Sequence, residues 1–163
     1  PDADVLVVDD ASPDGTGDLA AALARDAPGR IDVIHRPEKA GLAGAYVAGI
    51  RRALGHDSCH VALMDADGSH DPYDLPRLVA AAARADAVLG SRYCRGGSTP
   101  GWPARRRLLS IAGGRYAAAV LGLPIADPTS GFRVMRRSAV AATDLHSVTA
   151  AGFAVNLELT WRL

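Results

Sequence analysis

Four short apolar runs, separated by segments of helical length, constrain the fold of this chain more than any other feature. The runs are residues 5–8, 31–35, 60–64 and 87–90. Continuous apolar runs of this length are typical of strands buried on both faces, as in a parallel sheet. Helices are expected between them, at 18–27, 42–54 and 73–84, with Thr16 as a cap of the first. Strands and helices that alternate in this way predict an α/β fold with an open parallel sheet flanked by helices.

The chain is predicted to be one domain that spans residues 1–163. This length suits one α/β domain, and 48% hydrophobic with 22% charged residues excludes intrinsic disorder. The first strand begins at Val5 with almost nothing before it. The last predicted helix, 156–163, has no stop signal. We therefore expect a domain that is truncated at both ends.

Cysteine usage and hydropathy indicate the compartment. The only cysteines, Cys59 and Cys94, lack the spacing of a metal site, so a reducing cytosol is the expected environment and both are expected to be buried apolar filler. The chain opens without the basic and then apolar segment of a signal peptide, and it has no run of about 18 apolar residues. A cytoplasmic location is predicted.

Charge is distributed unevenly, although 18 basic residues balance 18 acidic ones. Residues 1–74 hold 14 acids and 6 bases, whereas residues 75–163 hold 4 acids and 12 bases. This asymmetry favours cation binding at one end of the molecule and phosphate binding at the other. The alternative is a chance segregation of solvated surface charge.

Charged residues follow directly after three of the predicted strands. Asp9 and Asp10 follow the first, Asp65 the third and Arg92 the fourth. Ligands of open α/β sheets lie beyond the carboxyl ends of the strands, so these side chains should converge on one crevice. Asp9 and Asp10 are suited to bind a base edge or ribose hydroxyls, and a turn formed with Ser12 is the alternative.

Asp65 and Asp67 form the strongest single motif. Two carboxylates one residue apart in a turn can share a divalent cation, and Mg²⁺ or Mn²⁺ prefers such oxygen ligands. A surface turn without a metal is the alternative. For His70 and Asp71, which follow, helix capping is the alternative to a role in the site.

Arginines of the basic half are candidates for phosphate binding. Arg92 is the best placed, because it lies at a strand end. The cluster 105–107 can steer an anionic acceptor or a lipid headgroup, and a solvated helix start is the alternative for at least one of the three. The helix after it, to about residue 121, is either an interfacial helix on anionic lipid or an amphipathic helix packed on the sheet. The segment 127–133 combines Asp127, turn residues and Arg133 in a loop suited to phosphate or sugar.

Four sequence blocks occur in order, and together they resemble a known family. They are residues 7–16, 64–72, 90–93 and 127–133, and the similarity extends to Gly152, Phe153 and Glu158. The blocks resemble those of the polyprenol (dolichol) phosphate mannose synthases, which are inverting family 2 glycosyltransferases. The resemblance implies a GT-A fold, a Rossmann-like and mostly parallel sheet flanked by helices.

The resemblance also implies a reaction, in which GDP-mannose is the nucleotide-sugar donor and a polyprenyl phosphate the acceptor. The donor site implied is Asp9, Asp10, Asp65, Ala66, Asp67 and Arg92. Asp65 and Asp67 would face Mg²⁺ or Mn²⁺. The acceptor phosphate is assigned to Arg92, Arg106 and Arg133, and the catalytic residues to Asp67, Arg92 and Asp127. A peripheral position at the cytoplasmic face of the membrane follows, and no nucleic acid partner is expected.

Two features depart from the family pattern. Ser69 stands where some relatives have a metal-binding Gln, and the first strand, with its Pro-x-Tyr-Asn-Glu nucleotide site, is missing. The alternatives within glycosyl transfer are a polyprenyl-phosphate glucose synthase that uses UDP-glucose and a family 2 polysaccharide glycosyltransferase. A non-catalytic remnant of the same fold is a third. A phospho-receiver domain is disfavoured, because it needs a lysine after the fifth strand and the only lysine is Lys39.

Overall fold

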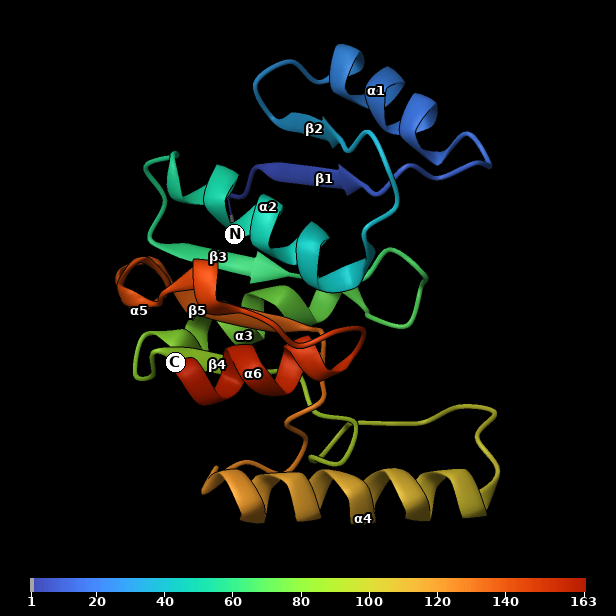
Figure 1. Cartoon of the computed structure of the whole chain (residues 1–163), viewed down its shortest axis with the longest axis vertical. Coiled ribbons are helices and arrows are strands. Elements are labelled where there is room, and N and C mark those ends of the chain that lie inside the picture. Colours follow the sequence, from blue (N-terminus) through green and yellow to red (C-terminus); the bar gives the residue numbers. More distant parts are fainter. Residues whose placement is uncertain (1) are drawn as a thin grey trace.

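Five strands and six α-helices alternate through the part of the chain that the computed structural model describes, residues 2–163 (Figure 1). The strands are β1 (Val5–Asp9), β2 (Ile31–His35), β3 (His60–Leu63), β4 (Ala87–Leu89) and β5 (Arg133–Arg136). The helices are α1 (Thr16–Asp26), α2 (Gly41–Leu54), α3 (Leu75–Ala82), α4 (Ala104–Leu121), α5 (Arg137–Ala142) and α6 (Ala154–Arg162). Two short 3-10 helices, η1 (Pro72–Asp74) and η2 (Leu145–Ser147), complete the described fold.

The predicted elements are present, with bounds shifted by a few residues, and two of their starts differ. Thr16 does not cap the first helix. Instead, the Asp14 carboxylate accepts hydrogen bonds from the Thr16 backbone N–H (3.1 Å) and hydroxyl (2.6 Å), and Thr16 is the first helical residue. The predicted helix 73–84 divides into η1 and α3, and the Asp71 side chain caps η1 by accepting from the backbone N–H of Tyr73 (2.9 Å).

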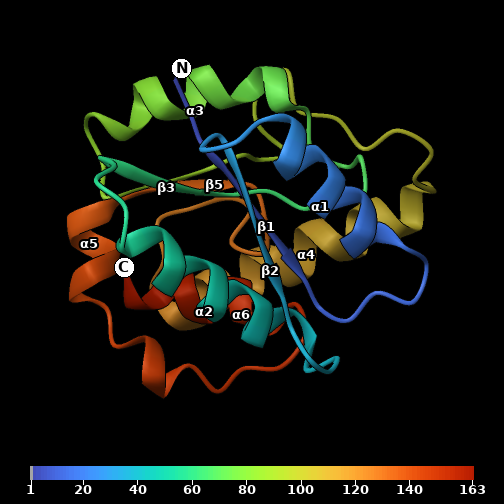
Figure 2. The same cartoon turned by 90° about the horizontal axis from the view of Figure 1, so that it is seen from above.

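The strands form two groups. β1 pairs with β2 in parallel, from Val5 opposite Ile31 to Asp9 opposite His35. β5 lies between β3 and β4 and runs antiparallel to both. Helix α2 packs against both β1 and β3, so it joins the two groups (Figures 1 and 2). The α/β class is confirmed, but the antiparallel β5 was not predicted, because only Val134 and Met135 separate its two arginines and the apolar signal is too short.

The core lies on both faces of β5. Met135 belongs to a cluster between α2, β3 and α6 with members Tyr46, Ile50, Val61, Val140, Leu145, Val155 and Leu159. Val134 points to the other face, into a cluster with Leu78, Ala82 and Phe132 beside α3. This alternation follows from the two-residue period of a strand. Cys59 and Cys94 are exposed free thiols, so the expectation of buried filler is wrong.

Helix α4 lies apart from the rest of the domain (Figure 1). Its buried residues are Gly114 and Ala118, and its large apolar side chains Leu108, Leu109, Tyr116 and Val120 are 65–75% exposed. The alternative of an amphipathic helix packed on the sheet is therefore wrong. Within residues 2–163, none of the helices combines the length and apolar character needed to cross a membrane.

Candidate functional site

The turn after β1 places Asp9 and Asp10 in different surroundings. Asp9 is 8% exposed, and its carboxylate accepts from the Ser12 backbone N–H (3.2 Å) and lies 3.6 Å from His35 Nδ1. The hydrogen bonds from Ser12 hold the pKa of Asp9 below its usual value. A sharp turn follows, in which Ala11 adopts a left-handed φ of 55°.

Asp10 is engaged by the start of α2. Its Oδ1 pairs with Arg36 and accepts from the Ala40 backbone N–H (3.3 Å), and its Oδ2 accepts from that of Gly41 (2.8 Å). Both oxygens therefore satisfy backbone donors at a helix end, where such donors lack partners within the helix. Asp10 fastens the β1 turn to α2, and a nucleotide hydroxyl would have to share these oxygens.

The turn after β3 is folded back by His70. Its Nδ1 accepts a hydrogen bond from the Asp65 backbone N–H (3.0 Å), its Nε2 lies 4.0 Å from Asp65 Oδ2, and its ring stacks on Phe132 with centroids 5.2 Å apart. Asp71 caps η1, as the helix-capping alternative predicted. For His70 that alternative is wrong, because its ring closes the turn. Asp65 thus lies at the start of a constrained loop and Asp67 lies within it.

Asp65 and Asp67 differ in burial. Asp65 is half-buried, and its Oδ1 accepts from the Tyr46 hydroxyl of α2 (2.8 Å). A side chain at position 131 would lie 2.7 Å from Asp65 Oδ2, so this close approach requires Gly131. Asp67 is exposed, and its Oδ1 accepts from the Ser69 backbone N–H (2.9 Å). Hydrogen bonds from Ser69 lower the pKa of Asp67, so it is charged at neutral pH.

Arg133 lies in the core rather than in the crevice. It is 0% exposed, and its terminal nitrogens donate to the backbone oxygens of Ser130 and Asn156 and to the Thr160 hydroxyl. Burial lowers its pKa to about 10, and the negative charge of Asp65 opposes that shift. Its assignment to the acceptor phosphate is therefore corrected, because Arg133 fastens the loop before β5 to α6 and presents no donor to solvent.

Arg92 and Asp127 form an ion pair at the end of β4. Arg92 Nε and Nη2 donate to the two Asp127 carboxylate oxygens (2.9 and 2.6 Å), its backbone N–H donates to the same carboxylate (3.1 Å), and Nη2 also contacts the Thr129 hydroxyl. Burial alone raises the pKa of Asp127, but the hydrogen bonds from Arg92 outweigh it and the pKa lies below its usual value. Asp127, 3% exposed, therefore orients Arg92.

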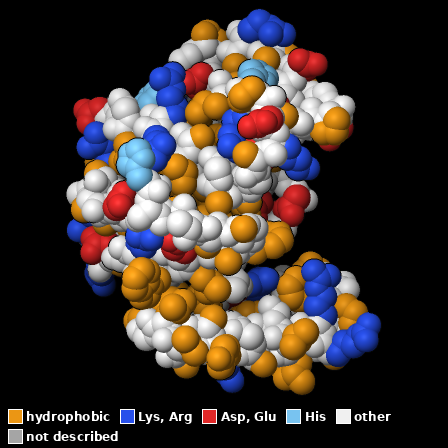
Figure 3. Space-filling view, viewed as in Figure 1, with side chains coloured by type: hydrophobic (Ala, Val, Ile, Leu, Met, Phe, Trp, Pro, Cys, Tyr) orange, Lys and Arg blue, Asp and Glu red, His pale blue; other side chains and the backbone are white. Residues whose placement is uncertain are grey.

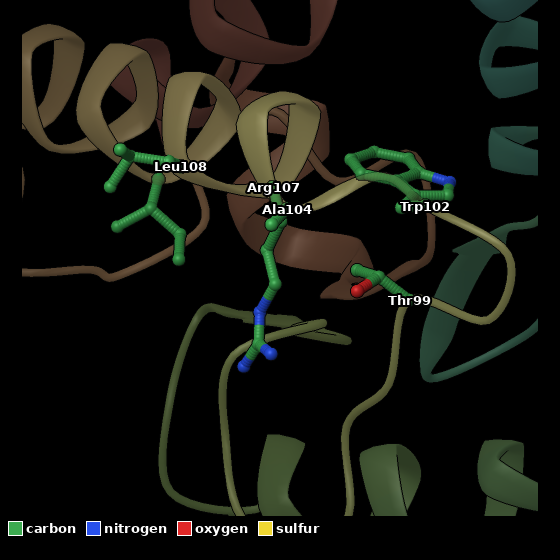
Figure 4. Close-up of a pocket in the computed structure, with 6 residues that line it drawn as sticks. Thr99, Trp102, Ala104, Arg107 and Leu108 are labelled. Atoms are coloured by element: carbon green, nitrogen blue, oxygen red, sulfur yellow. The ribbon is translucent and has the colours of Figure 1, made fainter.

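The start of α4 carries the arginine cluster. Arg106 stacks over the Trp102 ring at 4.1 Å from its centroid. Arg107 extends into a hollow of about 430 Å³ that is lined by Thr99, Trp102, Ala104, Leu108 and Ile111 as well (Figure 4). In the space-filling view, a cleft that opens on the right lies between the lower part of the molecule, which holds α4, and the part above it (Figure 3). The cluster thus borders a space open to an anionic ligand.

A family model places the chain among known proteins. The model of glycosyl transferase family 2 matches residues 1–143. The chain belongs to glycosyl transferase family 2. Its match begins before β1 and runs through α5, so it includes every segment of the site described above.

Curated relatives of this family 2 member carry mannosyltransferase names. Undecaprenyl-phosphate mannosyltransferase of Micrococcus luteus is 46% identical over 162 residues, which cover 99% of this chain and 66% of that protein. Polyprenol monophosphomannose synthase of Mycolicibacterium smegmatis is 46% identical over 163 residues, 99% of this chain and 62% of that protein. Dolichol-phosphate mannosyltransferase of Pyrococcus furiosus is 35% identical over 161 residues, which cover 96% of this chain and 43% of that protein. The chain thus spans less than two thirds of each relative.

A solved structure confirms the GT-A fold class. Glucosyl-3-phosphoglycerate synthase from Mycobacterium tuberculosis superimposes with a TM-score of 0.59 and 22% identity, over 96% of this chain and 52% of that one. At this identity the likeness concerns the fold alone.

The family 2 site gathers around the segment 127–133. This segment contacts Asp65 through Gly131, Arg92 through Asp127 and His70 through Phe132. Sequence reasoning located the acidic turn and Arg92 at their strand ends. It missed Tyr46 and Trp102, because a tyrosine on an amphipathic helix and a tryptophan in a glycine-rich loop carry no pattern that distinguishes them from packing residues.

Proposed function

We propose that the full-length protein transfers mannose from GDP-mannose to a polyprenyl phosphate, with inversion at the anomeric carbon. The observation that carries this proposal is 46% identity, across 99% of the chain, to two relatives that are named for mannose transfer to such lipids. Because the chain spans less than two thirds of those relatives, the activity is assigned to the full-length protein. The site geometry supports the assignment with the exposed carboxylate of Asp67 in the turn after β3 and with Arg92 and Arg106 near the start of α4.

Asp65 and Asp67 are the proposed ligands of a divalent cation. Among residues 2–163 no group of three or more His, Cys, Asp or Glu side chains is arranged to hold a metal ion. A Mg²⁺ or Mn²⁺ bound at Asp65 and Asp67 would complete its shell with waters and substrate phosphates. The charged, exposed Asp67 and the half-buried Asp65 supply such a pair. A cation bound there would stabilise the charge of the leaving diphosphate as a Lewis acid.

Donor binding is assigned to the turns after β1 and β3. The proposed contacts are Asp9, Asp10, Ala66 and the Asp65–Asp67 pair, with Arg92 toward the phosphates. Of these, the Asp10 carboxylate is already occupied by Arg36 and by the start of α2. Asp9 is buried and accepts from Ser12. We therefore assign Asp9 and Asp10 to shaping the donor turn, and direct contact to the exposed Asp67.

Acceptor binding is assigned to Arg92 and Arg106. Both are oriented by partners: Arg92 by Asp127 and Arg106 by Trp102. Oriented guanidiniums offset the repulsion between the acceptor phosphate and the donor diphosphate and hold the two reactants in place. Asp127 acts through Arg92, so we assign it a positioning role in place of the catalytic one.

The reaction proposed is a single displacement. A phosphate oxygen of the acceptor, already anionic at neutral pH, forms a bond to the anomeric carbon. The bond from that carbon to the diphosphate breaks, and its electron pair leaves with GDP. No strong general base is required, because the attacking oxygen carries no proton to remove.

The exposed face of α4 is assigned to the membrane surface. Its exposed Leu108 and Leu109 are the proposed contacts with apolar lipid, and Arg105 and Arg106 beside them are the proposed contacts with anionic headgroups. A location at the cytoplasmic face is the corresponding proposal.

The test is a competition between donors. Full-length protein is incubated with GDP-mannose, UDP-glucose, Mg²⁺ and a polyprenyl phosphate, and the lipid product is weighed by mass spectrometry. A polyprenyl-phosphate hexose formed from isotopically labelled GDP-mannose supports the proposal. Lipid product formed from UDP-glucose, or no lipid product from GDP-mannose, overturns it.

A further inference from the structure

The Trp102 ring lies near two arginines that are separated in the sequence. The Arg92 guanidinium carbon is 5.4 Å from the centroid of its ring, and that of Arg106 is 4.1 Å away. Arg92 follows β4 and Arg106 lies in the first turn of α4, so the ring bridges the domain and the helix that stands apart from it. Guanidiniums near aromatic faces are attracted by the negative charge of the ring face.

The two guanidiniums carry more positive charge than their surroundings neutralise. Asp127 occupies Nε and Nη2 of Arg92, whereas Nη1 makes no hydrogen bond to any residue of the range 2–163, and the side chain is 32% exposed. Arg106 is exposed, and within the same range Trp102 is the partner of its guanidinium. Asp127 pairs with Arg92 alone, so the positive charge of Arg106 is not neutralised by a carboxylate among residues 2–163, and the excess charge favours an anion.

We propose that Trp102 is a positioning residue that holds Arg92 and Arg106 on one phosphate monoester, that of the acceptor. The inference rests on the proposed function and extends it to a residue outside the reacting groups. Like charges repel, and a long arginine on an exposed helix end loses rotamer freedom when it binds. The ring offsets both effects because it attracts each guanidinium before the ligand arrives.

The positioning of the two arginines by Trp102 is distinct from the attachment of α4 to the domain. The hydroxyls of Tyr93 and Ser110 are hydrogen-bonded at 2.6 Å, and Gly114 lies against Pro128, so α4 has further attachments. Loss of the indole ring should therefore change the positions of the Arg92 and Arg106 side chains and leave helix α4 in place.

The first test measures binding without turnover. The chain has two tryptophans, and Trp161 is exposed on α6, so Trp161→Phe leaves Trp102 as the fluorescent reporter in the described part of the protein. Where the full-length protein has further tryptophans, these are also replaced by Phe. Inorganic phosphate and farnesyl phosphate should each change the Trp102 emission saturably. In the same background Arg106→Gln should weaken binding about tenfold, and Arg115→Gln, on the same helix but away from the ring, should not.

Two outcomes of the titration overturn the inference. One is an emission that no phosphate changes. The other is a response to GDP without a response to farnesyl phosphate, which would place the donor there. Because Trp102 is intact in this experiment, neither outcome depends on whether a Trp102 variant folds.

The second test separates positioning from structure. In the full-length enzyme, Trp102→Leu should raise the KM for polyprenyl phosphate about 5- to 30-fold, with little change in kcat or in the KM for GDP-mannose. Trp102→Phe keeps an aromatic face and should restore most of the affinity. An unchanged KM, an equal loss toward both substrates, or no rescue by Phe overturns the inference. A wild-type enzyme that binds farnesyl phosphate but makes no mannosyl lipid would instead reject the proposed function.

Discussion

The carboxylates around the site differ in what their oxygens contact. Asp127 and Asp10 each pair with an arginine, Asp65 accepts from the Tyr46 hydroxyl, and Asp67 is exposed with one backbone donor on Oδ1. A carboxylate already paired with a cation has less attraction left for a ligand. Asp67 is therefore the residue of this set most available to a cation or a phosphate-bound water.

Asp67→Asn should nearly abolish mannosyl transfer while leaving the fold intact. The amide oxygen can still accept from the Ser69 backbone N–H, but the negative charge that would hold the cation is lost. We expect kcat to fall by at least about 100-fold. The measurement is the initial rate of lipid mannosylation across a Mg²⁺ titration. Asp57→Asn, an equal charge change at an exposed position, is the control, and substantial turnover by Asp67→Asn would contradict the metal assignment.

Asp127→Asn should change how stability depends on pH. The pKa of Asp127 in the folded state lies below that of an unfolded aspartate, so its ion pair stabilises fully above the unfolded pKa. This contribution is lost as the pH falls through the folded-state pKa. At pH 7 the free energy of unfolding of the variant should be about 2 kcal/mol lower than that of the wild type, since Arg92 loses its buried partner. Below about pH 4 the difference should shrink. Urea unfolding at a series of pH values checks this, and a pH-independent difference would refute it.

At the scale of elements, α4 exposes more large apolar side chains than any other helix of residues 2–163, namely Leu108, Leu109, Tyr116 and Val120. Helices of globular proteins gain most of their stability from an apolar face packed on a core. In α4 the buried positions are small, Gly114 and Ala118, and the leucines face outward. A second hollow, of about 770 Å³, runs along this face between Leu108, Leu109 and the arginines at the helix start. The arrangement suits a lipid surface.

Replacing Leu108 and Leu109 with Glu should weaken binding of the full-length protein to vesicles that contain anionic lipid. Burial of each leucine contributes about 1.5–3 kcal/mol, and each added charge is repelled by the headgroups, so the partition coefficient should fall at least about tenfold. Co-sedimentation with the vesicles measures it. The pair Leu19→Glu and Leu23→Glu is the matched control, since both are exposed leucines on α1. Equal losses from both pairs would refute a specific role for α4.

At the scale of the whole molecule, stability is concentrated around β5. Both hydrophobic clusters found in the described residues pack on its two faces, and their buried members come from helices and strands other than β1, β2 and α1. The β1–β2 pair is joined to the rest mainly through α2. Regions with few buried apolar contacts open at lower free energy than the global unfolding.

Hydrogen exchange should therefore be slowest in β5 and its neighbours and faster in β1 and β2. Val134 and Met135 are 0% exposed, whereas the residues of β2 are half-buried or exposed. Native-state exchange followed by mass spectrometry would resolve the two regions as separate opening units. Uniform protection across both would show instead that the domain opens as one unit.

The uneven charge of the two halves has a partial explanation in the fold. Several acids of the first half pair with arginines of the same half, as in Asp2–Arg30, Asp32–Arg52 and Asp10–Arg36. In the second half, the arginines at the start of α4 remain exposed. The asymmetry that concerns a ligand is thus confined to the acidic turn after β3 and the arginines near α4.

The sequence by itself determined strands β1 to β4, helices α1 to α4 and α6, and the position of the acidic turn and Arg92 after strands. These follow from local patterns, because the period of apolar residues and the preferences of turn residues act between neighbours along the chain. The family blocks are also local, and the family they indicate is confirmed.

Only the tertiary structure decided which charged side chains remain available. Arg133 is buried because Asn156, far along the chain, accepts from it, and Arg92 is oriented because Asp127 lies opposite. The place of β5 likewise depends on strands that lie far from it in sequence. Burial and ion pairing are set by distances between residues remote in sequence. A sequence pattern can therefore indicate Arg133 or Asp10 as a candidate ligand-binding residue. It does not show that the side chain is already hydrogen-bonded to another residue of the chain.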